Sequence, residues 1–375
     1  METRRYIIER LLTAVLATVL LSGCSLIDED LSDCGEETEV DYELQLVTNM
    51  TTEVQTQLSA QTDLALAATV KNFLSNIFTD FAHDVILSFY STEGDGALLH
   101  HDEHIMDGSE KSYTLYIPRK TYMHLAVANI EGDPVVRLED TENCHGAVLR
   151  QAEGDTIDSH NTGIFTARQL MEMVEGIDQT FNVKLYMCNC SAMLVVDPNG
   201  HDISGMQVFT TGFATAFFIA DSVYEYKTPS PLIRTRRMEP DDKGHVGFVS
   251  VNFPSREPSS KDEVRGTRNE ERDARCEVRG TNDESSETRT VIETTEPFIA
   301  QPGDEVLWEF RVYLPQPDGT TTETILGIKE PLRAGQLKIV KVRIGENGIP
   351  ESESPNVGIS VTLDWKPGGE YQPEL

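Results

Sequence analysis

The feature that most constrains this chain is a repeated alternation of apolar and polar residues. It is cleanest near the C-terminus, where one face would carry five apolar residues, namely Val357, Ile359, Val361, Leu363 and Trp365. Successive side chains of a strand point to opposite faces of a sheet, so this pattern is typical of a half-buried strand. A stripe of five apolar residues must be buried against a partner, which is either a sheet of the same chain or another subunit. These residues are therefore our candidate partner strand.

Shorter runs of the same alternation predict strands along most of the chain. In the first half the predicted strands cover residues 40–47, 84–90, 113–117, 123–127 and 164–174, the last running into a short helix. In the second half they cover residues 181–187, 192–196, 246–253, 305–314, 321–328 and 337–344. Turn residues predict a hairpin between Tyr90 and Leu98 and another at residues 197–200. The apolar stretch 206–226 predicts a central strand pair bent at Gly212.

Two stretches break the alternation. Residues 52–81 contain no proline and carry apolar residues at intervals of roughly three and four, which predicts a helix or helix pair covering part of a sheet. Residues 255–290 are charged and rich in Ser and Arg, and the five residues 263–267 recur as 277–281. This second stretch predicts a disordered loop, because it cannot bury enough apolar surface to offset the entropy of ordering.

The N-terminus predicts a cleaved signal and a lipid anchor. Arg4, Arg5 and Arg10 precede an apolar run at residues 11–21, which is too short to cross a bilayer. The run ends in Leu21-Ser22-Gly23-Cys24, which resembles the lipobox of bacterial lipoproteins. The resemblance implies a signal peptide over residues 1–23, cleavage between Gly23 and Cys24, and acyl chains on Cys24 that hold the protein on a membrane. A buried first helix with an incidental cysteine is the alternative.

Acidic residues follow directly in the linker over residues 24–38. Asp28, Glu29 and Asp30 resemble the surface-export signal of Bacteroidetes lipoproteins. A solvated spacer is the simpler interpretation, and the two are compatible.

Length and charge narrow the remaining choices. Of 375 residues, 375 − 23 = 352 remain after the signal, which suits two domains better than one. We expect an N-terminal β-sandwich over residues 39–176, a C-terminal β-sandwich over 177–366, and a tail over 367–375. The formal net charge is −32, and such a surface repels nucleic acid and anionic lipid headgroups, so neither is an expected partner through a basic patch.

Six cysteines are present, and an odd number remains once Cys24 is assigned to lipid: Cys34, Cys144, Cys188, Cys190 and Cys276. An odd number in an oxidising compartment predicts at least one free or intermolecular thiol. Cys188 and Cys190 are expected on one face of one strand, where they cannot easily bond each other. A bond from either to Cys34 or Cys144 stays open.

Enzymatic and metal chemistry find little support in the sequence. The segment His100-His101-Asp102-Glu103-His104 is the one metal-like cluster, but it falls in a predicted hairpin and has no second ligand group at helical spacing. Asp221 is the only carboxylate that follows a long apolar run, and a strand-end carboxylate is its simpler interpretation. No nucleophile elbow, phosphate loop or dinucleotide fingerprint is present. We therefore expect no metal, no cofactor, no small-molecule substrate and no catalytic residue.

Several segments together resemble the FimB-type fimbrial anchor lipoproteins of type V pili. They are Cys24 with the acidic run to Cys34, the predicted strand 40–47, residues 85–90 before a glycine turn, and residues 122–129. The resemblance implies a mainly β protein of two transthyretin-like (Greek-key) β-sandwiches in series, holding the base of a fimbria on the outer membrane. Its implied partners are pilin subunits. The helical stretch at 52–81 and the Arg-rich repeat depart from the family pattern.

The leading hypothesis is therefore a non-enzymatic, surface-exposed outer-membrane lipoprotein that anchors a fimbria by strand pairing or docking with a pilin subunit. Loss of residues 40–47 by cleavage would sever the body from Cys24, so we expect this strand to be kept. A glycan-binding surface lipoprotein, or an adhesin-type subunit at the fimbrial tip, is the alternative. Tyr224 and Tyr226 are its candidate contacts, whereas Trp308 and Trp365 lie on apolar strand faces and are expected in the core.

Overall fold

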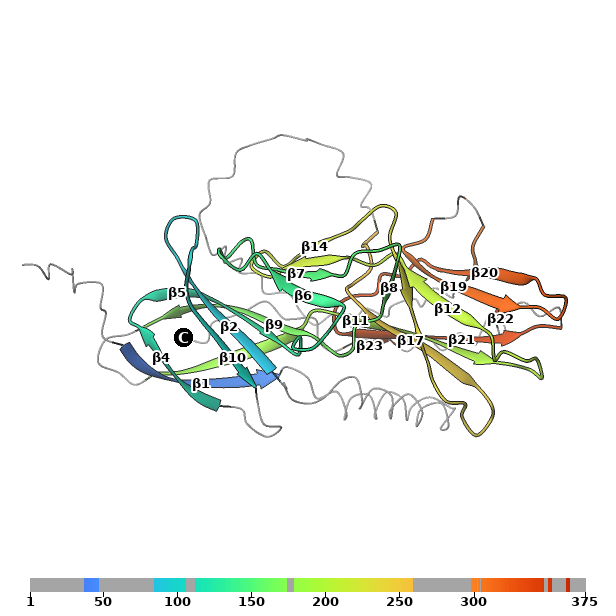
Figure 1. Cartoon of the computed structure of the whole chain (residues 1–375), viewed down its shortest axis with the longest axis horizontal. Helices are drawn as coiled ribbons and strands as arrows, with labels where there is room; N and C mark the ends of the chain where they lie inside the picture. The colour runs from blue at the N-terminus through green and yellow to red at the C-terminus, as the bar shows by residue number, and fades with distance from the viewer. Residues whose placement is uncertain are drawn as a thin grey trace, which may run out of the picture.

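The computed structural model describes residues 37–46, 84–105, 112–173, 179–258, 298–301, 303, 305–346, 350–352 and 362–364. Every regular element within these residues is a β-strand, and the strands form four sheets in an elongated molecule (Figure 1). The mainly β class predicted from the alternation is therefore confirmed for the described part of the chain.

A seven-stranded sheet forms most of the N-terminal half. Its order is β3-β2-β5-β9-β10-β1-β4. The strands are β1 (Glu37–Leu46), β2 (Asp84–Ser91), β3 (Leu98–Ile105), β4 (Ser112–Pro118), β5 (Thr121–Ala128), β9 (Phe165–Glu172) and β10 (Gln179–Met187). Strands β9 and β10 pair only through Thr166 with Tyr186 and Phe165 with Met187, so the sheet divides there into two layers. The layers are β3-β2-β5-β9 and β10-β1-β4.

The core of this half lies between the two layers. Alternate residues of β2, β5 and β9 meet alternate residues of β4 and β10 there, among them Phe89, Tyr122, Phe165, Ile117 and Leu185, all fully buried. The apolar residues of the alternating pattern that predicted each strand are thus the residues on its buried face.

Two six-stranded sheets face each other in the C-terminal half. One has the order β16-β17-β11-β21-β22 with β23 also paired to β21, and the other is β18-β20-β19-β12-β15-β8. The strands of the first, which we call the β21 sheet, are β11 (Cys190–Asp197), β16 (Arg236–Arg237), β17 (Val246–Asn252), β21 (Gln336–Ile344), β22 (Pro350–Ser352) and β23 (Thr362–Asp364). Those of the second, the β19 sheet, are β8 (Thr156–Asp158), β12 (Gln207–Thr211), β15 (Leu232–Arg234), β18 (Phe298–Ile299), β19 (Trp308–Pro315) and β20 (Thr321–Ile328). A second core fills the space between them, with Leu194, Phe248, Trp308 and Phe310 among its members.

The two halves share sheets. A four-stranded sheet, β14-β13-β7-β6, combines β6 (Val136–Glu139) and β7 (Val148–Gln151) with β13 (Ala216–Phe218) and β14 (Val223–Glu225). A third core lies between this sheet and β2-β5-β9, and includes Leu125, Leu149 and Phe217. Strand β8 likewise pairs in parallel with β15 and so extends the β19 sheet. Figure 1 shows β6, β7 and β14 in one layer and β8 next to the strands of the C-terminal half.

The hairpin predictions had mixed outcomes. Strands β2 and β3 pair antiparallel as predicted. The hairpin at residues 197–200 is wrong, because this turn carries the chain from β11 in the β21 sheet to β12 in the β19 sheet. Gly212 is a bend as predicted, with φ of +101°, and a Cβ there would lie 2.6 Å from the carbonyl oxygen of Leu307. The chain leaves the β19 sheet at this bend and enters the shared sheet, so the predicted central pair is divided between two sheets.

Several predictions fall outside the described residues. They are the signal peptide, the linker up to residue 36, the helical stretch 52–81, the short helix after Glu172, most of the Arg-rich loop and the tail. The last two residues of the predicted linker, 37 and 38, belong to β1.

Candidate functional site: the tether strand and the β21 edge

The strand that follows the predicted lipid anchor is held on both sides. β1 pairs in parallel with β10 from Val40 to Leu46 and antiparallel with β4 from Glu37 to Glu43. At its centre the hydroxyl of Thr114 donates a hydrogen bond to Asp41 Oδ1 at 3.2 Å. Gly23, Cys24, Asp28, Glu29 and Asp30 lie outside the described residues. A pulling force on those N-terminal residues would be transmitted to the folded part of the protein through β1. We call β1 the tether strand.

The candidate partner strand is described only at residues 362–364. These form β23, which pairs antiparallel with Gln336, Leu337 and Lys338 of β21. Val357, Ile359, Val361 and Trp365 lie outside the described residues, and for Leu363 only the backbone is described. The described part of the candidate strand therefore pairs with a sheet of its own chain.

β21 is the strand to which both β22 and β23 are hydrogen-bonded. It pairs in parallel with β11 along one side, and on the other side with β22 through residues 342–344 and with β23 through residues 336–338. Lys338 is 2% exposed and forms an ion pair with Glu330. A buried charge needs such a partner, because an uncompensated ammonium would make burial costly. This pair therefore fixes the position of β21 at the level where β23 joins it.

The junction between the halves is a buried polar cluster around Asn189, in the two-residue link from β10 to β11. Asn189 Nδ2 donates to the carbonyl oxygen of Thr162 at 2.9 Å, and its Oδ1 accepts from the backbone N–H of Ile164 at 3.1 Å. Arg236 donates to the carbonyl oxygen of His160 at 3.0 Å. Burial lowers the pKa of His160 to about 4, and the nearby Arg236 acts in the same direction while Asp133 opposes it. These hydrogen bonds from Asn189 and Arg236 hold residues 159–164 against the C-terminal strands.

A second buried histidine lies in the N-terminal core. The ring of His124 stacks on Phe89 with centroids 4.4 Å apart, and its Nδ1 is 3.1 Å from the carbonyl oxygen of Ser88. Burial lowers the pKa of His124 to about 3. Sequence reasoning missed both buried histidines, since nothing around them distinguishes them from exposed ones.

The predicted metal-like cluster is dispersed along an edge strand. His101 contacts Ser88 and Glu103, while His100 packs against Phe89. Within the residues that the structure describes, no group of three or more His, Cys, Asp or Glu side chains could hold a metal ion. Asp221, the remaining carboxylate candidate, is 41% exposed and hydrogen-bonded to His145.

The aromatic side chains proposed for glycan contact are structural. Tyr224 stacks on Phe217 and donates its hydroxyl to the carbonyl oxygen of Cys188 at 2.8 Å. Tyr226 donates to the carbonyl oxygen of Ser255 at 2.9 Å. The interpretation of this pair as an exposed edge platform is therefore wrong, because both rings are half-buried against the third core. Trp308 is 1% exposed, as predicted for a core residue.

The expected placement of two cysteines is also wrong. Cys188 precedes β11 and lies in the third core, whereas Cys190 lies in the second. They do not share a face of one strand, because the chain changes sheets between them. Cys144, Cys188 and Cys190 are buried thiols, and burial raises the pKa of Cys188 and Cys190 well above the usual value.

No helix among the described residues is long and apolar enough to span a bilayer. The sequence matches no known family model, and no curated protein resembles it.

Some solved structures resemble the chain loosely. A proposed adhesin from Bacteroides ovatus is 12% identical with a TM-score of 0.45, over 88% of this chain and 97% of that one. The fimbrial anchor protein Mfa2 from Porphyromonas gingivalis is 11% identical with a TM-score of 0.37, over 58% and 73% respectively. A fimbrial assembly protein from Parabacteroides distasonis is 10% identical with a TM-score of 0.38, over 84% and 94%. The structures similar to this chain thus include a fimbrial anchor and an assembly protein, at an overlap too loose to transfer the role of any residue.

Proposed function

We propose that the protein is a non-enzymatic lipoprotein of the outer-membrane surface that anchors the base of a fimbria. Cys24 carries the lipid, Asp28, Glu29 and Asp30 direct export, and the body presents a β edge or face to a pilin subunit. The β-sandwiches are transthyretin-like and stand in series, separating the membrane from the partner. No catalytic group or cofactor takes part.

The observation that carries this proposal is the pairing of the tether strand on both of its edges. A strand that enters the fold directly after a lipidated cysteine can transmit a pull only if it is bonded into the body. β1 is paired with β4 and β10 over nearly all of its ten residues. Its side-by-side bonding also means that its removal would open a gap inside a layer, which supports a subunit that keeps its first strand.

The C-terminal edge is the proposed place of contact with the pilin. β23, described over residues 362–364, meets β21 beside the buried pair of Lys338 and Glu330. The backbone groups of a sheet edge can pair with an extended segment of another chain, which is how strand addition binds a partner. We propose that residues 357–365 pair with the pilin, or that the pilin docks beside them on the uncleaved edge.

Deletion of residues 356–375 tests this assignment. Cells carrying the deletion should keep the protein in the outer membrane but release fimbriae into the medium, as measured by immunoblot of both fractions. A matched control replaces Thr321 and Thr322 of β20 with Ala, since these exposed or half-exposed residues lie away from the β21 edge. Full fimbrial retention by the deletion variant would reject the edge as the contact.

The lipid anchor is tested separately by Cys24→Ser. This variant should leave the membrane fraction and carry the fimbria with it. A Cys24→Ser protein that still sediments with outer membranes in its native host would reject the tether and the anchoring role together.

A further inference from the structure

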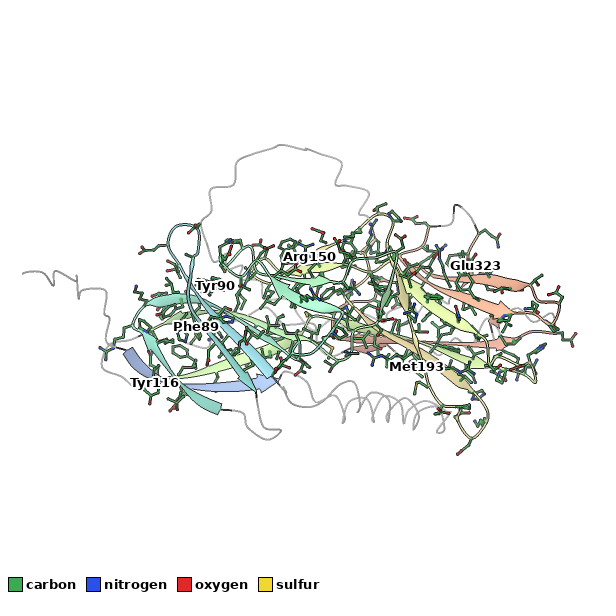
Figure 2. All side chains as sticks on the ribbon, in the orientation of Figure 1. Phe89, Tyr90, Tyr116, Arg150, Met193 and Glu323 are labelled. Carbon is green, nitrogen blue, oxygen red and sulfur yellow. The ribbon has the colours of Figure 1, made fainter. Side chains whose placement is uncertain are left out.

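Gln151, the last residue of β7, is a buried amide in the shared sheet. The residue is 2% exposed, and among the described residues neither its Oε1 nor its Nε2 has a hydrogen-bond partner. Arg150, labelled in Figure 2, lies on the outer side of β7, where it pairs with Glu139 and Glu225. Side chains alternate along a strand, so Gln151 points inward together with Leu149 of the third core. Buried amides are costly without partners, and native proteins satisfy nearly all of them with protein groups or ordered water.

His160 presents a second buried polar atom of this kind, its ring nitrogen Nε2. The residue is 0% exposed, and Nε2 has no partner in the part of the chain that the structure describes. The amide of Asn189 indicates which ring nitrogen carries the proton. Its Oδ1 accepts from the backbone N–H of Ile164, so its Nδ2 is the donor that lies 3.3 Å from His160 Nδ1. Since Nδ1 accepts, a neutral ring carries its proton on Nε2, which is therefore a buried donor.

The backbone brings Gln151 and His160 to the same end of the third core. Gln151 pairs with Val136, the first residue of β6. Just before β6, Asp133 Oδ2 accepts from the backbone N–H of Asn161 at 3.0 Å. The chain that enters β6 therefore lies against the residue that follows His160.

Both side chains also reach the third core itself. Opposed residues of paired strands project to the same face of a sheet, so Gln151 points into the core beside Val136, which is one of its members. The ring of His160 packs edge-on against Phe253, another member, with centroids 4.8 Å apart. A donor on His160 and an amide on Gln151 thus project into one apolar core.

We propose that ordered water, either one molecule or a short chain, is bound inside the third core between His160 Nε2 and the amide of Gln151. The water accepts a hydrogen bond from His160 Nε2–H and donates one to Gln151 Oε1. An internal water makes about three hydrogen bonds to buried polar groups, and Gln151 Nε2 supplies a further donor. The water links β7 of the shared sheet to residues 159–164 at the junction between the halves. This inference concerns the folded body and does not rest on the anchoring role.

A high-resolution crystal structure of the unaltered protein tests the site directly. We expect density for water that is hydrogen-bonded at one end to His160 Nε2 and at the other to Gln151 Oε1. A direct hydrogen bond between the two side chains would overturn the proposal. So would a protein group bonded to Gln151 in place of water, or the lack of any water joined to both residues.

Gln151→Leu gives an independent test in solution, by urea unfolding. An amide that was merely buried without partners could be replaced by this apolar side chain with no loss of stability. Where water joins it to His160, the replacement leaves Nε2–H without an acceptor, and the equilibrium constant for unfolding should rise about tenfold. In a His160→Phe background there is no such donor, and the same replacement should change this constant less than about twofold. An equal effect in both backgrounds, or no effect in either, would overturn the proposal.

The matched control is Gln336→Leu. Gln336 is also buried, at 6% exposed, and its Oε1 accepts from the backbone N–H of Arg333 at 2.9 Å. This bond does not involve His160, so the control should raise the unfolding constant by the same factor with His160 or Phe at position 160.

Discussion

Two histidines, His124 and His160, are buried as neutral side chains in a protein that carries a large excess of acidic groups. Burial lowers the pKa of His124 to about 3 and that of His160 to about 4. An unfolded histidine takes up its proton near pH 6.5, so below that pH the unfolded state binds more protons than the native state. Stability is therefore complete above pH 6.5 and falls as the pH drops toward the native pKa values.

We expect His124 alone to lower the free energy of unfolding by about 2 kcal/mol between pH 7 and pH 5. His124→Asn keeps an N–H near the position of Nδ1 but cannot titrate. Its free energy of unfolding should be lower than that of the parent protein at pH 7, but it should fall less between pH 7 and pH 5. Urea unfolding at a series of pH values measures both slopes. Equal slopes for the variant and the parent protein would mean that His124 is not the group responsible.

Single residues were the least predictable level from sequence. Gly212 could be predicted as a bend because glycine is the usual residue where φ is positive, and its contact with the backbone of Leu307 agrees with that reason. The cores that bury Cys188 and Cys190 could not be predicted, because they depend on a change of sheet that two residues of sequence do not reveal. The same holds for Tyr224, whose hydrogen bond to Cys188 joins distant parts of the chain.

At the level of elements, the tether strand is the one that bears on the proposed function. Both of its edges are paired around Asp41, which is opposite Thr180 of β10 and Thr114 of β4. The backbone N–H groups of a strand in this position are hydrogen-bonded to one neighbouring strand or the other, unlike those of a strand at the edge of a sheet.

Asp41→Pro should therefore lower the free energy of unfolding by about 3 kcal/mol or more, because proline removes an N–H that is bonded to one neighbour or the other. The matched control Asp41→Ala loses only the exposed hydrogen bond from Thr114 and should cost about 1 kcal/mol or less. Urea unfolding of both purified variants gives the two values. If proline costs no more than alanine, the pairing of β1 on both sides is wrong.

Most strands were predictable because alternation reports one buried face directly, as in β10 and β19. Their partners were less so. The turn at residues 197–200 has good hairpin chemistry, yet β11 and β12 lie in different sheets because both of their apolar faces are needed to close the second core. Turn residues specify how the chain reverses, and the packing of the core decides which strand it meets.

At the level of the whole molecule, the two halves are interlocked by shared sheets. β7 and β8 come from the first half of the chain but pair with β13 and β15 from the second, and β6 joins the shared sheet through β7. Asn189 bonds the link between the halves to residues 162 and 164. No local pattern could predict this exchange, since each of these strands is short and their partners are far along the chain.

We expect the halves to unfold in one cooperative transition rather than two. Asn189→Ala leaves the buried N–H of Ile164 without its acceptor and should lower the free energy of unfolding by about 2 kcal/mol while keeping a single transition. Fluorescence of Trp308 reports the C-terminal half, and hydrogen exchange of β2 and β5 reports the N-terminal half. Separate midpoints for the two probes in the parent protein would contradict the interlocked arrangement.

The order of pairing along the chain also sets when folding can finish. The first strand pairs with residues 179–185, and β11 pairs with residues 337–343. If a chain crosses a membrane from its N-terminus, its early strands therefore emerge before the strands with which they pair, and they stay unpaired until most of the chain has crossed. Such long-range pairing is slow and leaves aggregation-prone intermediates, so the export proposed above should depend on chaperones that keep the chain unfolded until its last strands are available.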